Sequence, residues 1–170
     1  MASLMEELLE VLGEEEKQYQ ELIELADVKS QAIIKADIDK LGEVTTQEQN
    51  AASTLLNLSN KRARVLDDMA TVLGKDPAKM TINKMIGYLE NQPEEQKKLS
   101  ERRDRLLEAG TQMQRLNQQN ETLLKQALEM VEFDLTLLRS MRQAPETANY
   151  NKNAYNTGDL LGSSGFDAKQ

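Results

Sequence analysis

The side chains that most often do chemistry in proteins are scarce in this sequence. The chain has no Cys and no His, so disulfides and thiolate metal sites cannot form, and the commonest general base is missing. The carboxylates of Glu14, Glu15 and Glu16 have no His or Cys nearby in sequence to complete a metal site. We therefore assign no catalytic residue, no metal ligand and no cofactor, and we predict that the protein is not an enzyme.

Two basic clusters resemble sites that could contact phosphate. They consist of Lys61, Arg62 and Arg64 in NKRAR, and of Arg102, Arg103 and Arg105 in ERRDR. Acidic residues flank both clusters on long predicted helices, which favours solvated or salt-bridging faces. The net charge of -8 also argues against nucleic acid and anionic membranes as partners.

Membrane insertion and secretion are not expected. No stretch approaches the roughly 20 apolar residues of a membrane span. The N-terminal segment MASLMEELLEVLGEEE is acidic and amphipathic, whereas a signal peptide has a basic start and a continuous apolar run. We expect a cytoplasmic protein.

Binding is the chemistry that the sequence favours, because the segment from Leu116 to Met141 carries two apolar rows at helical spacing. The seam row is Leu116, Leu123, Ala127, Met130, Leu137 and Met141; the outer row is Leu124, Leu128, Val131, Leu135 and Leu138. One row is enough to hold a helix against its neighbours. The outer row therefore indicates either burial between the other helices or a face that binds a partner's amphipathic helix.

Two asparagines, Asn117 and Asn120, lie just before the leucine pair in LNQQNETLL. Asn120 falls on the spacing of the seam row, and Asn117 lies one step aside. Buried asparagines on a helical seam fix register and oligomeric state at a cost in stability. We hypothesise that at least Asn120 is partly buried; the alternative is that both side chains face water.

The elements that must position these residues are helices. Leu, Glu, Gln, Lys, Arg and Ala are plentiful, while Gly, Pro and aromatic residues are few, which favours long helices. Apolar steps of three and four predict an all-α fold: an elongated antiparallel bundle or coiled coil of three long helices, at about 3–36, 38–73 and 93–142, with a short helix at about 82–89. The last helix would be about 75 Å long.

The apolar stripes are the rows of residues at steps of three and four that predict the first two long helices. Both stripes contain charged residues. Glu15 and Lys29 fill gaps in the first stripe, and Arg62 lies on the second.

Cap residues set the boundaries of the predicted elements. Asp37 can cap a helix start, Thr45 begins the first of two overlapping capping boxes, and Gly74 can end the second helix. We expect a bundle domain over 1–143 and a flexible, disordered tail over 144–170, because the tail is rich in Asn, Gly and Ser and cannot bury enough surface to order itself.

The sequence resembles the FlgN family of flagellar export chaperones. The stretch LNQQNETLLKQALEMVEFDLTLL is similar to the family signature of two Asn three apart, a Leu pair and a helical run. The segment AIIKADIDKLGEVTTQEQ resembles the family's first turn, and the tail NYNKNAYNTG, followed by GFDAK, resembles its C-terminal pattern. The resemblance covers nearly the whole chain.

This resemblance implies a function and partners. Family members are small cytosolic helical proteins that bind the C-terminal region of the hook-associated proteins FlgK and FlgL, prevent premature assembly and bring them to the export apparatus. The client is held through the C-terminal helical part, which implies client binding by the outer row. A tail tyrosine is implicated in docking to the cytosolic domain of the export gate protein FlhA. Tyr150 matches that tyrosine best, and Tyr155 is a competing match.

A second interpretation remains open. The protein could be a structural or adaptor coiled-coil protein that forms a homodimer or larger homo-oligomer through its apolar C-terminal helix. Such a protein would need no client to cover the outer row.

Overall fold

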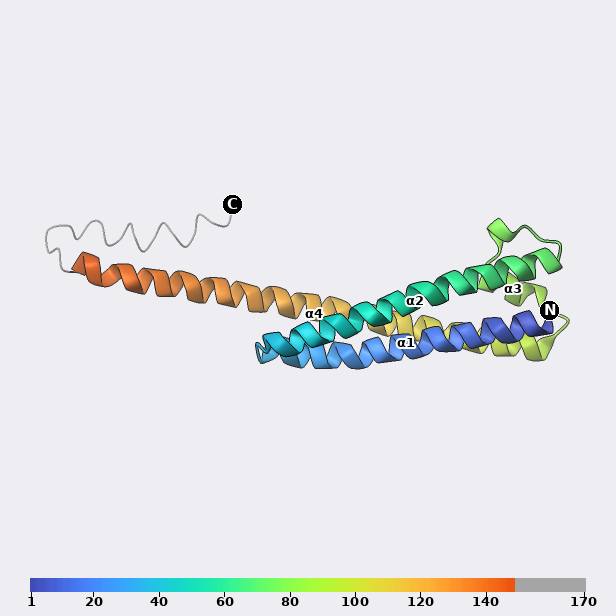
Figure 1. Cartoon of the computed structure of the whole chain (residues 1–170), viewed down its shortest axis with the longest axis horizontal. Coiled ribbons are helices and arrows are strands. Elements are labelled where there is room, and N and C mark those ends of the chain that lie inside the picture. Colours follow the sequence, from blue (N-terminus) through green and yellow to red (C-terminus); the bar gives the residue numbers. More distant parts are fainter. Residues whose placement is uncertain (149–170) are drawn as a thin grey trace. The chain divides into compact units, whose positions relative to one another are not determined.

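A computed structural model describes the backbone of residues 1–148 and the side chains of residues 1–142. It is built from α1 (Ala2–Ile34), α2 (Ile38–Val72), the 3-10 helix η1 (Pro77–Lys79), α3 (Ile82–Tyr88) and α4 (Pro93–Ala148) (Figure 1). The part of the chain that is described contains no strand, and the all-α prediction is confirmed. The chain divides into two compact units, Met1–Glu121 and a second unit that begins at Thr122.

The first unit is a three-helix bundle. α1 and α2 lie side by side and antiparallel (Figure 1). The first half of α4 packs on them: Arg102 lies 3.8 Å from Glu16 of α1, and Met113 packs with Leu22. Residue numbers therefore rise together along α1 and α4, so α4 runs parallel to α1 and antiparallel to α2.

The apolar core is concentrated at the end of the bundle where α1 begins. Its buried members are Met5, Leu8, Leu12, Val65, Leu66, Met69, Met85, Leu89 and Leu99. Met85 is fully buried, so α3 closes this end of the bundle and gives the apolar residues of the α2–α4 connection a place to pack. The second cluster, around Leu22, Ala51 and Met113, is much thinner.

The turns follow from cap chemistry. The Asp37 carboxylate accepts a hydrogen bond from the Lys40 amide over 3.1 Å and caps α2. Gly74 follows α2 with φ of 63°, in the left-handed region that glycine adopts without strain. Ala36 occupies the same region after α1, with φ of 53°. A residue with a Cβ is unfavourable there, which makes Ala36 a strained position.

Two local expectations need correction. The Thr45 hydroxyl donates to the carbonyl of Leu41 over 2.8 Å rather than capping a new helix. α2 already begins at the Asp37 cap, so the threonine lies in a helix interior and bonds one turn back. α4 was expected to end near Arg142 but extends to Ala148, through Pro145. Proline removes a single backbone donor, and the surrounding alanines favour helix.

Candidate functional site

Two carboxylates of the acidic run Glu14–Glu16 have a structural role. Glu15 is 2% exposed, and the Arg62 Nη1 donates to its Oε2 over 2.8 Å. Burial raises the pKa of Glu15 above the ordinary 4.5, and the Arg62 charge and hydrogen bond oppose that rise. Glu16 lies 3.8 Å from the Arg102 guanidinium. These carboxylates hold α1 to α2 and α4.

The basic clusters are mostly paired with acids. Besides Arg62 and Arg102, the Lys61 ammonium lies 3.6 Å from Glu7. Arg103 lies 2.9 Å from Asp104 and donates to the Asn83 side chain over 3.0 Å. Pairing of this kind leaves little positive charge gathered for a phosphate group.

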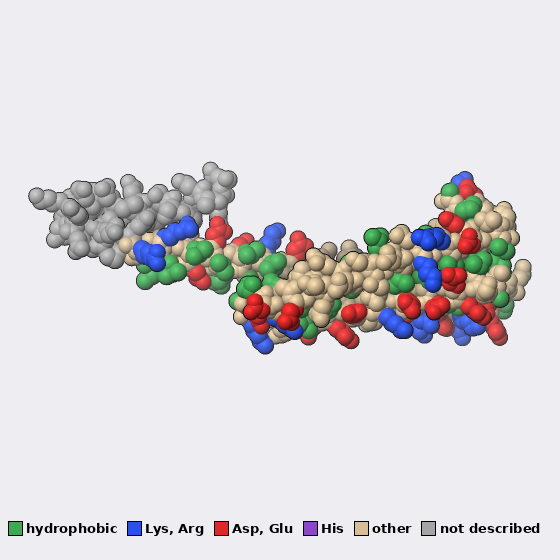
Figure 2. Space-filling model, in the orientation of Figure 1, with side chains coloured by type: hydrophobic (Ala, Val, Ile, Leu, Met, Phe, Trp, Pro, Cys, Tyr) green, Lys and Arg blue, Asp and Glu red, His purple; other side chains and the backbone are tan. Residues whose placement is uncertain are grey.

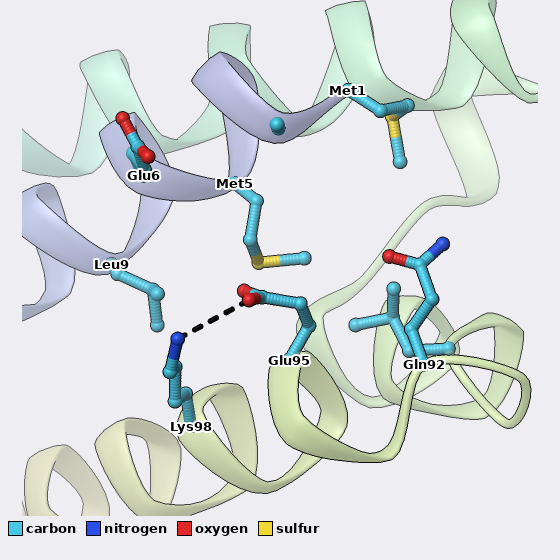
Figure 3. A pocket seen from close by; sticks show the side chains of 9 residues that line it. Met1, Met5, Glu6, Leu9, Gln92, Glu95 and Lys98 are labelled. Carbon is cyan, nitrogen blue, oxygen red and sulfur yellow. Dashed lines mark hydrogen bonds and ion pairs between the residues drawn. The ribbon is translucent and has the colours of Figure 1, made fainter.

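One cavity of about 240 Å³ lies between the start of α1 and the start of α4 (Figure 3). Met1, Met5, Glu6 and Leu9 line one side, while Gln92, Glu95 and Lys98 line the other. Glu95 and Lys98, which both belong to α4, form an ion pair over 3.2 Å in this cavity (Figure 3). Among the described residues no three His, Cys, Asp or Glu side chains gather where they could hold a metal ion, and we assign no chemistry to this cavity.

The second half of α4 exposes its apolar side chains. Hydrophobic side chains are visible along this part of the helix (Figure 2). In the outer row, Leu124 is half-buried and the other four are exposed, Leu128 by 60% and Leu135 by 48%. The leucines are therefore not sandwiched between helices of the described chain. A run of large exposed apolar side chains along one helix is uncommon in a protein that acts alone.

Sequence reasoning missed that the last three members of the seam row are uncovered as well, whereas Leu116, Leu123 and Ala127 are half-buried. Met130 is 63% exposed, Leu137 49% and Met141 61%. Phe133, which belongs to neither row, is 64% exposed. A comparison of helix lengths would have indicated this exposure. α1 has 33 residues and α2 has 35, whereas α4 has 56. Helices of about 50 Å cannot cover one of about 84 Å along its whole length.

The two asparagines differ in environment. Asn120 is 5% exposed, and its Nδ2 donates to the backbone carbonyl of Ala26 in α1 over 2.8 Å. Asn117 is exposed, beside a groove lined by Tyr19 and Glu48. Asn120 therefore fastens α4 to α1 inside the first unit; a role in setting register stays a prediction.

The tail tyrosines, Tyr150 and Tyr155, lie outside the described residues. Within the described part of the chain, no helix is both long enough and apolar enough to cross a membrane.

Exposed apolar side chains along the last helix of a bundle are typical of helical proteins that bind another chain. The family model described as FlgN protein matches residues 1–158. The chain belongs to the FlgN family, which is a family of flagellar export chaperones. Comparisons with curated proteins and with solved structures found no match.

Proposed function

We propose that this protein is a cytoplasmic chaperone that binds the C-terminal region of the hook-associated proteins FlgK and FlgL, prevents their premature assembly and delivers them to the export gate. Membership of the FlgN family supports the general role. The observation that carries the proposal is the exposure of the outer row in the second half of α4. An amphipathic client segment laid on this row would be unavailable for self-association.

The energetics suit reversible binding. Burying one Leu or Val side chain contributes about 1.5–3 kcal/mol, before the costs of association and ordering. Because the client's own apolar side chains are buried on the same row, we expect a net affinity in the micromolar to nanomolar range, roughly -8 to -12 kcal/mol. Release then needs only a competing contact at the export apparatus and no covalent step.

The direct test replaces Leu128 and Leu135 together with Glu. Both side chains are exposed, so helical content should stay nearly unchanged while FlgK and FlgL binding is lost. Lys125→Glu is the matched control, because it changes the net charge by the same two units on the polar side of α4. Binding that survives the double substitution would place the site elsewhere, and melting of the helix would make these leucines part of a core.

Delivery is proposed to use the tail, through Tyr150 or Tyr155 and the cytosolic domain of FlhA. Truncation after Ala148 is expected to keep FlgK binding and to weaken FlhA binding. Loss of FlgK from the truncated protein would instead put the client site in the tail.

The alternative function is a homo-oligomeric coiled-coil protein, which the same exposed rows could support. A free protein that forms a stable dimer or tetramer with its apolar rows already covered would favour this alternative.

A further inference from the structure

The apolar surface of the second half of α4 is wider than one partner helix can cover. With about 100° of rotation per residue, the side chains between residues 123 and 141 form an apolar arc of about 180°, from Leu137 at one edge to Leu128 at the other. The arc consists of Leu123, Leu124, Ala127, Leu128, Met130, Val131, Leu135, Leu137, Leu138 and Met141, with Asp134 as its one interruption. A helix that faces a single neighbour needs a stripe of roughly 100°.

Heptad spacing connects this arc with a position that two helices enclose in the first unit. Met113 is 5% exposed there and packs with Leu22 of α1 and Ala51 of α2. Steps of seven lead from Met113 through Asn120 to positions 127, 134 and 141. The line of positions by which the first half of α4 packs between a pair of helices therefore continues through the apolar arc of the second half.

Asp134 occupies that central position in the second half. Among the described residues it makes no ion pair, and it is exposed. Two helices laid on the arc would bury its carboxylate, which is costly without a donor. The first unit shows how this fold buries a carboxylate: Glu15 of α1 is paired with Arg62 of α2 at 2.8 Å. A partner would need a Lys or Arg in the equivalent place.

We propose that the partner of the second half of α4 is a pair of amphipathic helices, with a basic residue facing Asp134, rather than a single helix. The pair would complete a three-helix arrangement around α4. This inference rests on the proposed function, because it takes the hook-associated client as the source of the two helices. It specifies the client as a helical hairpin and adds the seam row to the binding surface.

The first test uses the absence of cysteine in the chain, which allows single-cysteine variants without a background thiol. Leu135→Cys and Leu137→Cys report on opposite edges of the arc, and the two leucines have nearly equal exposure, 48% and 49%. Glu132→Cys on the polar side is the control. With saturating full-length FlgK, the rate of maleimide labelling should fall by about tenfold or more at both edges, and by less than about threefold at the control.

The second test is Asp134→Asn, matched by Glu132→Gln. A buried charge pair that loses one partner should weaken FlgK binding by about 30-fold or more. An exposed carboxylate on the polar side should contribute less than about fivefold. An effect of Asp134→Asn no larger than that of Glu132→Gln would overturn the basic residue in the proposal.

The remaining outcomes separate the inference from the proposed function. If bound FlgK slows labelling at one edge only, the partner is not a pair of helices. The proposed chaperone function would still stand. If labelling of the free protein slows at both edges as the protein concentration rises, a second copy of the chain covers the arc. That result would overturn the inference. No binding of FlgK or FlgL by the wild-type protein would refute the proposed function, and the inference with it.

Discussion

The buried pair of Glu15 and Arg62 gives the sharpest prediction about stability, because its two members differ in exposure. The Glu15 side chain is 3% exposed and that of Arg62 is 29% exposed. Arg62→Met leaves a buried carboxylate without its cation. Breaking a buried pair in this way costs 3–5 kcal/mol in typical cases, and the partial exposure of Arg62 favours about 3 kcal/mol here.

The reverse substitution should be much milder. Glu15→Leu removes the buried charge itself, while Arg62 keeps access to water and its contact with the Ser59 hydroxyl. We expect a loss of less than about 1 kcal/mol. The double variant Glu15→Leu/Arg62→Met should be close to wild type, because an apolar pair of similar volume often replaces a buried ion pair without loss.

Urea unfolding followed by circular dichroism measures these differences. With a slope of about 2 kcal/mol per M, Arg62→Met should lower the urea midpoint by about 1.5 M at pH 7. Equal losses for the two single variants, or an unchanged midpoint for Arg62→Met, would refute the reasoning.

The pH dependence of Arg62→Met follows from the same pair. Burial raises the pKa of Glu15 above 4.5, and Arg62 opposes the rise. Without Arg62 the folded-state pKa is higher still. The folded state then binds the proton more tightly than the unfolded state, so stability increases as pH falls through the window above 4.5. The difference in free energy of unfolding between wild type and Arg62→Met should therefore shrink as pH is lowered from 7 towards 4.5. A difference that grows would contradict the pairing of Arg62 with a buried Glu15 carboxylate.

Two further substitutions test the bundle. Ala36→Gly should raise the free energy of unfolding by about 0.5–1 kcal/mol, because φ at Ala36 is 53°; a loss in the same urea assay would show that the turn is not strained. Asn120→Leu should raise stability by about 1 kcal/mol, since added apolar burial outweighs one hydrogen bond. It should leave FlgK affinity within about threefold, and a larger loss would bring Asn120 into contact with the client.

Local sequence determined much of the fold. Asp37 and Gly74 mark helix ends through chemistry that acts within a few residues, so both could be read directly. Ala36 could not, because alanine gives no signal for the left-handed residue of a helix end, although the Ala36 and Asp37 amides donate to Ile33 and Ala32 in the usual way. The continuation of α4 past Pro145 was missed because a proline weakens a helix without always ending it.

Contacts between helices could be predicted only in part. Glu15 and Arg62 stood out as charged members of apolar stripes, but their pairing spans 47 residues and depends on the relative register of α1 and α2. The bond from Asn120 to Ala26 spans 94 residues and depends likewise on how α4 lies on α1. The outer row was identified from periodicity, whereas the exposure of Met130 and Leu137 required a comparison of helix lengths.

Hydrogen exchange of the backbone amides from Thr122 to Arg142, with and without FlgK, tests the central claim most directly. These residues have few buried contacts in the free protein, so their amides should exchange readily. The chaperone function predicts slowing by about tenfold or more across this segment when FlgK is bound, with little change in the core around Leu8 and Met69. A segment that is already protected in the free protein, or one that FlgK leaves unchanged, would contradict the account.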